Sequence, residues 1–160
     1  MSSTLVQTSS LFPALPHLAV TFALLLLKTS LTSALQVVSR IRAKTFLLPE
    51  DAALMGTSMA QAEAPLAQRC ASVWRNDLEN IPLFLFAALI FTVLGGSENL
   101  AAWLFGTYIV ARYLHTVSYL LGRQPWRALC YLASVGTTWT VTLHAVWLAL
   151  AALNTGAAGR

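Results

Sequence analysis

Residues 80–97 read NIPLFLFAALIFTVLGGS and contain no charged side chain. An α-helix rises ~1.5 Å per residue, so about 20 mostly apolar residues cross the hydrocarbon core of a bilayer. The whole chain of 160 residues is 57% hydrophobic and 10% charged. Soluble domains carry about 25% charged residues, so we interpret this stretch as a spanning helix of an integral membrane protein.

Three further apolar stretches, residues 11–39, 99–122 and 128–159, have a similar character. Few of their side chains are basic: these are His17, Lys28, Arg112, His115 and His144. The sequence therefore predicts an all-α fold. We expect one membrane domain, residues 1–160, with helices at approximately 12–42, 70–96, 99–121 and 126–153 and a polar loop at approximately 43–69.

Two of the connections between the predicted helices are tight. Gly95-Gly96-Ser97 breaks one helix and caps the next, and Pro125 stands at a helix start, where its missing N–H costs little. Short loops force neighbouring helices to be antiparallel, so the fold is predicted to be an up-down four-helix bundle. A cleaved signal peptide is not expected, because no basic segment precedes the first apolar stretch.

Basic residues are distributed unequally among the connections. The second connection has none, and cytoplasmic loops are enriched in Lys and Arg. We therefore expect the first and third connections in the cytoplasm and both termini on the opposite side, in a bacterial inner membrane or the endoplasmic reticulum. The residues that carry this bias are Arg40, Arg42, Lys44, Arg69 and Arg75 in the first connection and Arg123 and Arg127 in the third.

The same distribution argues against two classes of function. The net charge is +4 at pH 7, but the basic residues lie near helix ends and form no patch, so no nucleic-acid partner is expected. Cys70 and Cys130 are too far apart for a CxxC metal motif or a disulfide framework, so no metal site is expected either.

Polar residues recur at helical spacing near the predicted cytoplasmic ends. Arg112, His115, Tyr119 and Arg123 follow three- and four-residue steps and share one helix face. Ionisable groups within membrane spans mark function by default. Several Arg with Asn, His and Tyr suit a small anion with carboxylates, and a Glu among them suits an ammonium group on that ligand.

Four motifs in order resemble the membrane-associated eicosanoid and glutathione metabolism (MAPEG) family, over about residues 28–131. These are Arg75-Asn76-Asp77-Leu78-Glu79-Asn80 before Ile81-Pro82-Leu83-Phe84, Arg112-x-x-His115-Thr116-x-x-Tyr119, Gln124-Pro125-x-Arg127-Ala128-Leu129 and Lys44-x-Phe46-x-x-Pro49-Glu50-Asp51. The resemblance implies a homotrimer with a glutathione site between subunits and no metal. The positions that match the family's glutathione-binding residues are Arg40, Arg75, Asn76, Glu79, His115, Tyr119, Arg127 and Tyr131.

By this resemblance, Arg127 and Tyr131 are the expected catalytic residues, with Arg127 stabilising the glutathione thiolate. Arg112 and Asp51 are further polar candidates. The expected function is detoxification by a glutathione transferase or peroxidase that acts on lipophilic electrophiles or hydroperoxides in the bilayer. Ala128 replaces the Ser of the family's prostaglandin E synthase branch, which favours transferase chemistry over isomerisation.

Three other functions stay open from the sequence. One is a glutathione-dependent isomerase of the prostaglandin E synthase type, which Tyr131 favours. The others are a small transporter and a non-enzymatic membrane scaffold. A proton-coupled transporter needs a carboxylate embedded in the membrane, whereas Asp77 and Glu79 are predicted to lie at the membrane boundary. A scaffold has no need of the Arg, His and Tyr stripe.

Overall fold

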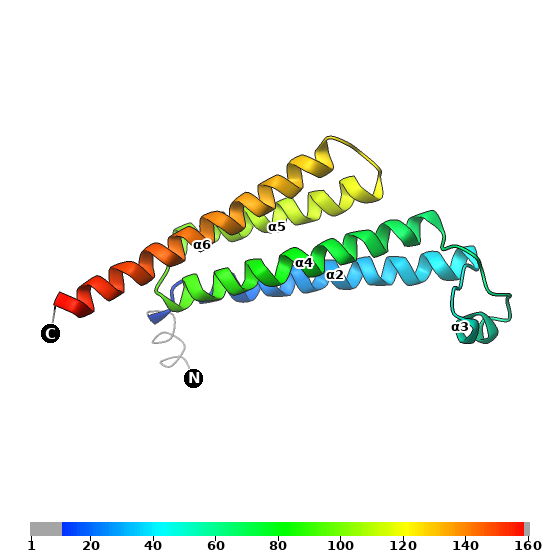
Figure 1. Ribbon diagram of the computed structural model, residues 1–160, viewed down its shortest axis with the longest axis horizontal. Helices are drawn as coiled ribbons and strands as arrows, with labels where there is room; N and C mark the ends of the chain where they lie inside the picture. The colour runs from blue at the N-terminus through cyan, green and yellow to red at the C-terminus, as the bar shows by residue number, and fades with distance from the viewer. Residues whose placement is uncertain (1–10, 159–160) are drawn as a thin grey trace.

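The computed structural model describes residues 11–158 and is all-helical over that range, which confirms the predicted fold class. Four long helices account for most of it, and one short helix lies between the first two (Figure 1). The bounds are α2 Leu15–Ala43, α3 Pro49–Leu54, α4 Pro65–Val93, α5 Glu98–Leu120 and α6 Trp126–Ala158.

The long helices form two antiparallel pairs. Figure 1 shows α2 beside α4 and α5 beside α6, and α4 and α5 also join the two pairs through contacts with α6 and α2. The α3 segment and the α5–α6 turn lie at the same end of the bundle (Figure 1). At this end, Arg69 of α4 links α4 to α5, because its Nη1 donates to the backbone carbonyl of Leu120 at 2.8 Å.

Local sequence signals explain where the helices begin and end. Prolines stand in the first turn of α2, α3 and α4, where their missing N–H breaks no helical hydrogen bond. Ser97 caps α5, because its Oγ accepts from the backbone N–H of Leu100 at 3.2 Å. Gly95 has a φ of +78°, and a side chain on Gly96 would overlap the Phe91 ring, so the tight α4–α5 turn requires both glycines.

The first connection contains more helix than the sequence predicted. Helix α3 occupies part of the expected loop, since Pro49 begins it and Glu50 and Asp51 in its first turn complement the helix dipole. Helix α4 begins at Pro65 and α6 continues to Ala158, so both extend beyond the predicted ranges. The termini, whose side of the membrane was predicted, and residues 1–10 and 159–160 of the predicted domain lie outside the described residues.

An aromatic core fills the bundle at the α4–α5 interface. Phe84 and Tyr108 stack with ring centroids 3.6 Å apart, and Phe105 packs edge-on against Phe84 at 5.7 Å. The outer surface is also apolar: Phe86 is 65% exposed and Trp103 is 75% exposed. Water is a poor solvent for such a surface, whereas lipid or another subunit covers it without penalty.

Three described helices, α2, α4 and residues Trp126–Asn154 of α6, are long and apolar enough to cross a membrane. The sequence predicted four spans. Helix α5 is the exception because Arg112 and His115 make it more polar, yet both side chains are buried within the bundle. These two polar side chains therefore face the neighbouring helices and not the surroundings.

Candidate functional site

Three charged side chains meet inside the bundle from three different helices. Asp77 of α4 accepts from Lys28 Nζ of α2 through Oδ2 and from Arg112 Nη2 of α5 through Oδ1. All three are at most 2% exposed. Because loss of the shared Asp77 carboxylate would leave two uncompensated buried cations, these contacts fix how the three helices pack. We refer to Lys28, Asp77 and Arg112 as the buried triad.

Sequence reasoning missed this triad as a unit. It treated Lys28 as an interruption of an apolar stretch, and it assigned Asp77 a position at the membrane boundary without predicting that the carboxylate is buried between helices. The available signal was one basic residue inside each of two apolar stretches, Lys28 and Arg112, with the acidic Asp77 three residues before a third stretch. Charges of opposite sign inside membrane spans pair with one another.

The triad carries one more positive than negative charge, and Arg112 extends it toward the predicted site. Arg112 Nη2 also donates to Oδ1 of Asn76 at 2.9 Å. Nε and Nη1 of Arg112 and Nδ1 of His115 are buried and lack a hydrogen-bond partner among residues 11–158. A polar ligand or water is the ordinary partner for such buried groups.

A second cluster forms where α5 ends and α6 begins, and it contains four of the predicted site residues. His115 lies 5.8 Å from Tyr119 and 6.4 Å from Tyr131, measured between ring centroids. The guanidinium carbon of Arg127 stands 4.6 Å from the centre of the Tyr119 ring. We refer to His115, Tyr119, Arg127 and Tyr131 as the turn cluster.

Arg127 is held in place by its surroundings but stays half-buried. The cation over the Tyr119 ring is attracted by the negative face of the aromatic system. With the amide of Gln124 oriented so that its oxygen faces the guanidinium, that oxygen accepts from Nη2 at 2.8 Å and from Nε at 3.0 Å. Arg127 also stands in the first turn of α6, at the positive end of the helix dipole.

The other predicted site residues lie apart from the turn cluster. Arg40 at the end of α2 forms an ion pair with Glu63 of the first connection. Arg75 and Glu79 share the outer surface of α4 and are exposed, and no salt bridge joins them within residues 11–158. Asp51 is exposed on α3. One chain alone therefore does not bring all the predicted residues together.

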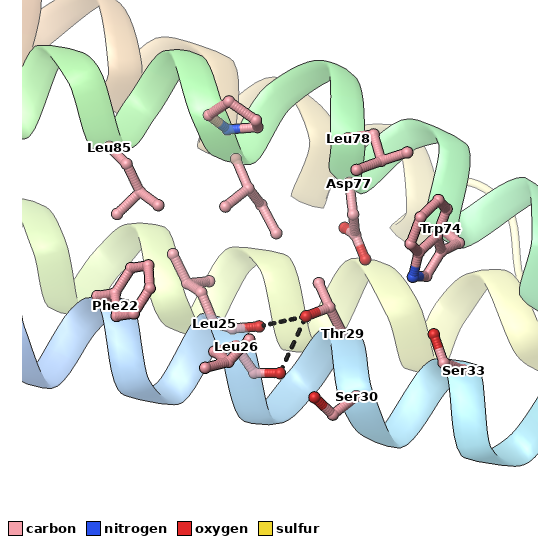
Figure 2. A pocket seen from close by; sticks show the side chains of 12 residues that line it. Phe22, Leu25, Leu26, Thr29, Ser30, Ser33, Trp74, Asp77, Leu78 and Leu85 are labelled. Atoms are coloured by element: carbon pink, nitrogen blue, oxygen red, sulfur yellow. Dashed lines mark hydrogen bonds between the residues drawn. The ribbon is translucent and has the colours of Figure 1, made fainter.

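A groove of about 660 Å³ runs between α2 and α4 on the outside of the bundle. Figure 2 shows Phe22, Leu25 and Leu85 along it, with Asp77 and Trp74 toward one end. The Thr29 hydroxyl donates to backbone carbonyls of its own helix, at 3.2 Å and 2.9 Å, and so adds little polarity. The groove is suited to an apolar chain. No group of three potential metal ligands is found in the described part of the chain.

Comparison with known proteins identifies the family. The sequence model of the MAPEG family matches residues 18–147. The chain belongs to the MAPEG family. This confirms the resemblance found in the four sequence motifs and, with the three apolar helices, shows that the protein is an integral membrane protein.

Named relatives of this MAPEG protein fall into two groups. Human prostaglandin E synthase is 33% identical over 136 residues, which are 84% of this chain and 90% of that protein. The bovine prostaglandin E synthase is 33% identical over 134 residues, or 83% and 88% of the two chains. Human microsomal glutathione S-transferase 1 is 33% identical over 120 residues, or 72% and 77%. Percentage identity does not separate the two groups.

Proposed function

We propose that this MAPEG protein is a glutathione-dependent membrane enzyme that transfers glutathione to lipophilic electrophiles and reduces lipid hydroperoxides. The observation that carries the proposal is the turn cluster. It places a half-buried arginine at a helix N-terminus beside two tyrosines and a buried histidine. A cation, a helix dipole and hydrogen-bond donors are the groups that stabilise a thiolate and hold a small anion.

Each proposed contact with glutathione follows from the chemistry of the side chain. Arg40, Arg75 and His115 hold its two carboxylates, and Glu79 meets its ammonium group. Asn76 and Tyr119 bond its peptide groups, and Tyr131 orients the sulfur beside Arg127. The exposed positions of Arg75 and Glu79 support this assignment, because side chains on the outer surface of α4 are accessible to a ligand held between subunits.

The proposed chemical step is a nucleophilic substitution. Arg127 favours the ionised sulfur, so the glutathione proton is released to solvent before attack. The thiolate then forms a C–S bond with the electrophilic carbon, and the leaving group departs with its electron pair. With a hydroperoxide, the thiolate attacks the terminal oxygen, the O–O bond breaks, and the alkoxide leaves with the bonding pair and takes up a proton to become the alcohol. A second glutathione thiol then converts the resulting sulfenic acid to the disulfide with loss of water.

A homotrimer is part of the proposal. Arg75 and Glu79 lie on the outer surface of one chain, so a neighbouring chain is needed to enclose glutathione between them and a turn cluster. The apolar outer faces of the helices provide surface for such packing. Native mass spectrometry in mild detergent should give three copies, and a monomer that binds glutathione would contradict this part.

We also propose that the turn cluster faces the cytoplasm, in the endoplasmic reticulum or a bacterial inner membrane. The basic residues of the first and third connections support this orientation. Single cysteines introduced at Ser58 and Ser97, in a background without Cys70 and Cys130, should react with an impermeant maleimide from opposite sides. Labelling of both from one side would overturn the proposed topology.

Isomerisation of the prostaglandin E synthase type is the second candidate function. It is supported by relatives of that name that are 33% identical over more than four fifths of this chain, and by Tyr131. Ala128 stands against it, because the hydroxyl that the synthase branch places beside this arginine is absent. Assaying lipid endoperoxide isomerisation beside conjugation decides between the two.

The experiment that tests the proposal is glutathione binding and turnover by the purified protein in detergent or nanodiscs. We expect glutathione to bind, and a chlorinated nitroaromatic and a lipid hydroperoxide to be consumed in its presence. S-methylglutathione is the matched control, since it should bind without reacting. A protein that binds no glutathione would be a scaffold or transporter and would overturn the proposal.

A further inference from the structure

The contact between Arg112 and Asn76 fixes which end of the Asn76 amide faces the bundle. Arg112 Nη2 lies 2.9 Å from the Asn76 side chain. A guanidinium has only donors and no acceptor, so the atom that faces it must be the amide oxygen. The amino group Nδ2 is therefore directed away from Arg112.

Arg112 cannot readily give up this orientation. Its side chain is fully buried, and the same Nη2 atom also donates to Oδ1 of Asp77, whose second oxygen is held by Lys28. Rotation of the guanidinium away from Asp77 would leave the buried Arg112 cation without its counter-ion and one carboxylate oxygen of Asp77 without a donor, which is strongly unfavourable. Arg112 thus holds the oxygen of Asn76, and the contact of Arg112 with Asp77 holds Arg112 in turn.

We propose that Arg112 is a positioning residue, which holds the Asn76 amide so that its Nδ2 group donates to a carbonyl or carboxylate oxygen of glutathione. The Asn76 side chain then recognises a hydrogen-bond acceptor of the ligand and does not recognise a hydrogen-bond donor. This inference rests on the proposed function, and it assigns the buried triad a role in recognition in addition to packing. The net positive charge of the triad also supports glutathione binding near Asn76, because it favours an anionic ligand nearby.

Two substitutions of Asn76 distinguish the two orientations of the amide. Asn76→Asp keeps an acceptor toward Arg112 but replaces the donor with a second acceptor, whereas Asn76→Ala removes both. We expect both variants to bind glutathione about ten-fold or more weakly than the wild type, with Asp no tighter than Ala, as measured by isothermal titration. Wild-type affinity in Asn76→Asp would show that the ligand donates to Asn76, and would overturn the proposal.

A double-mutant cycle tests whether Arg112 acts through Asn76. Arg112→Gln removes the excess charge of the triad, leaves the Lys28–Asp77 pair, and lets the Asn76 amide turn over, because Gln offers both a donor and an acceptor. We expect the KM for glutathione to rise several-fold with kcat close to wild type, since Arg127 is untouched. In the Asn76→Ala background the same change should have little further effect on KM. Equal losses in both backgrounds would assign Arg112 a purely structural role.

The melting temperatures of the two Asn76 variants provide a test that requires no glutathione. A carboxylate at position 76 neutralises the extra charge of the triad, so Asn76→Asp should melt above Asn76→Ala. The reverse order would overturn the clamped orientation even if Arg112→Gln does not fold. Failure of the wild type to bind glutathione would overturn the proposed function, and this order would then still decide the orientation.

Discussion

The buried triad and the turn cluster both contain an arginine of α5 or α6, but the two arginines have opposite surroundings. Arg112 is fully buried and is neutralised in part by a carboxylate, and three helices depend on the contact. Arg127 is half-buried, lies over an aromatic ring, and forms no ion pair among the described residues.

This difference separates a charge that organises the fold from a charge that is available for chemistry. A protein carboxylate cancels part of the field of a cation paired with it, so only the net charge of the triad acts on a ligand. A cation held by a ring face and an amide oxygen keeps its full charge and can still approach a thiolate. The comparison predicts that substitutions in the triad act mainly on stability or positioning, whereas substitutions in the turn cluster act on rate.

The largest effect is expected from Asp77→Ala. Lys28 and Arg112 would remain buried as two unpaired cations, and breaking a buried pair in this way costs roughly 3–5 kcal/mol. Thermal unfolding in detergent, followed by circular dichroism, should show a large drop in Tm. Glu79→Ala, two residues along the same helix at an exposed position, is the matched control and should leave Tm nearly unchanged. Equal shifts in the two variants would contradict the distinction between triad and surface.

The next largest effect is expected from Arg127→Ala on the rate of conjugation. A free thiol has a pKa near 8.5, and a shift of one pKa unit is ~1.4 kcal/mol of differential stabilisation. If Arg127 lowers the pKa of the bound sulfur by one to two units, its loss should reduce the rate at pH 7 by about ten-fold. At pH 9 the thiol ionises unaided, so the loss should be much smaller.

The control for this prediction is Arg127→Lys, which keeps the positive charge but loses the planar stacking on Tyr119. We expect it to recover part of the rate at pH 7. An equal loss at pH 7 and pH 9 in Arg127→Ala would mean that Arg127 serves binding or folding, and another group would have to stabilise the thiolate.

A third prediction concerns the separation of Arg75 from the turn cluster within one chain. If glutathione lies between subunits, Arg75 of one chain and Arg127 of the next serve the same site. Chains with Arg75→Ala and chains with Arg127→Ala, each with reduced activity at pH 7 when expressed alone, should then recover part of the lost activity when co-expressed, because some interfaces carry neither change. The measurement is conjugation by the purified mixed oligomer. Activity no higher than that of the separate variants would place each site within a single chain.

Sequence reasoning reached the turn cluster because local spacing encodes it. His115 and Tyr119 are one helical turn apart, and Tyr131 is one turn beyond Arg127, so the helix period alone puts each pair on one face. A tight turn at Gly122 then brings the ends of α5 and α6 together. The helices themselves followed from uninterrupted apolar stretches, of which residues 80–97 are the clearest.

The triad could not be predicted from the sequence because it depends on how the helices are rotated relative to one another. Lys28 and Asp77 are 49 residues apart, and Asp77 and Arg112 are 35 apart, so no local spacing links them. Asp77 stands in a run of polar residues, and only packing decides that it turns inward while its neighbour Glu79 turns outward. The pairing of Arg40 with Glu63 depends in the same way on the path of the first connection.

The smallest effect is expected at this Arg40–Glu63 pair. Its arginine is paired with a carboxylate, like Arg112 of the buried triad, but is partly exposed, like Arg127 of the turn cluster. Arg40 is proposed to hold a glutathione carboxylate, yet its guanidinium already faces the carboxylate of Glu63, and its side chain is 37% exposed. Glutathione must therefore compete with Glu63 for the same cation. Partly exposed ion pairs contribute about 0.2–1 kcal/mol, so Glu63→Gln should tighten glutathione binding by no more than about five-fold. Isothermal titration at low and at high salt measures this, and the gain should shrink at high salt because screening already weakens the pair.

Glu50→Gln on the exposed surface of α3 is the matched control and should leave the affinity unchanged. Weaker binding in Glu63→Gln would show that the ion pair holds Arg40 in its binding position, which would place Arg40 with the positioning charges of the triad and not with the charges that meet the ligand.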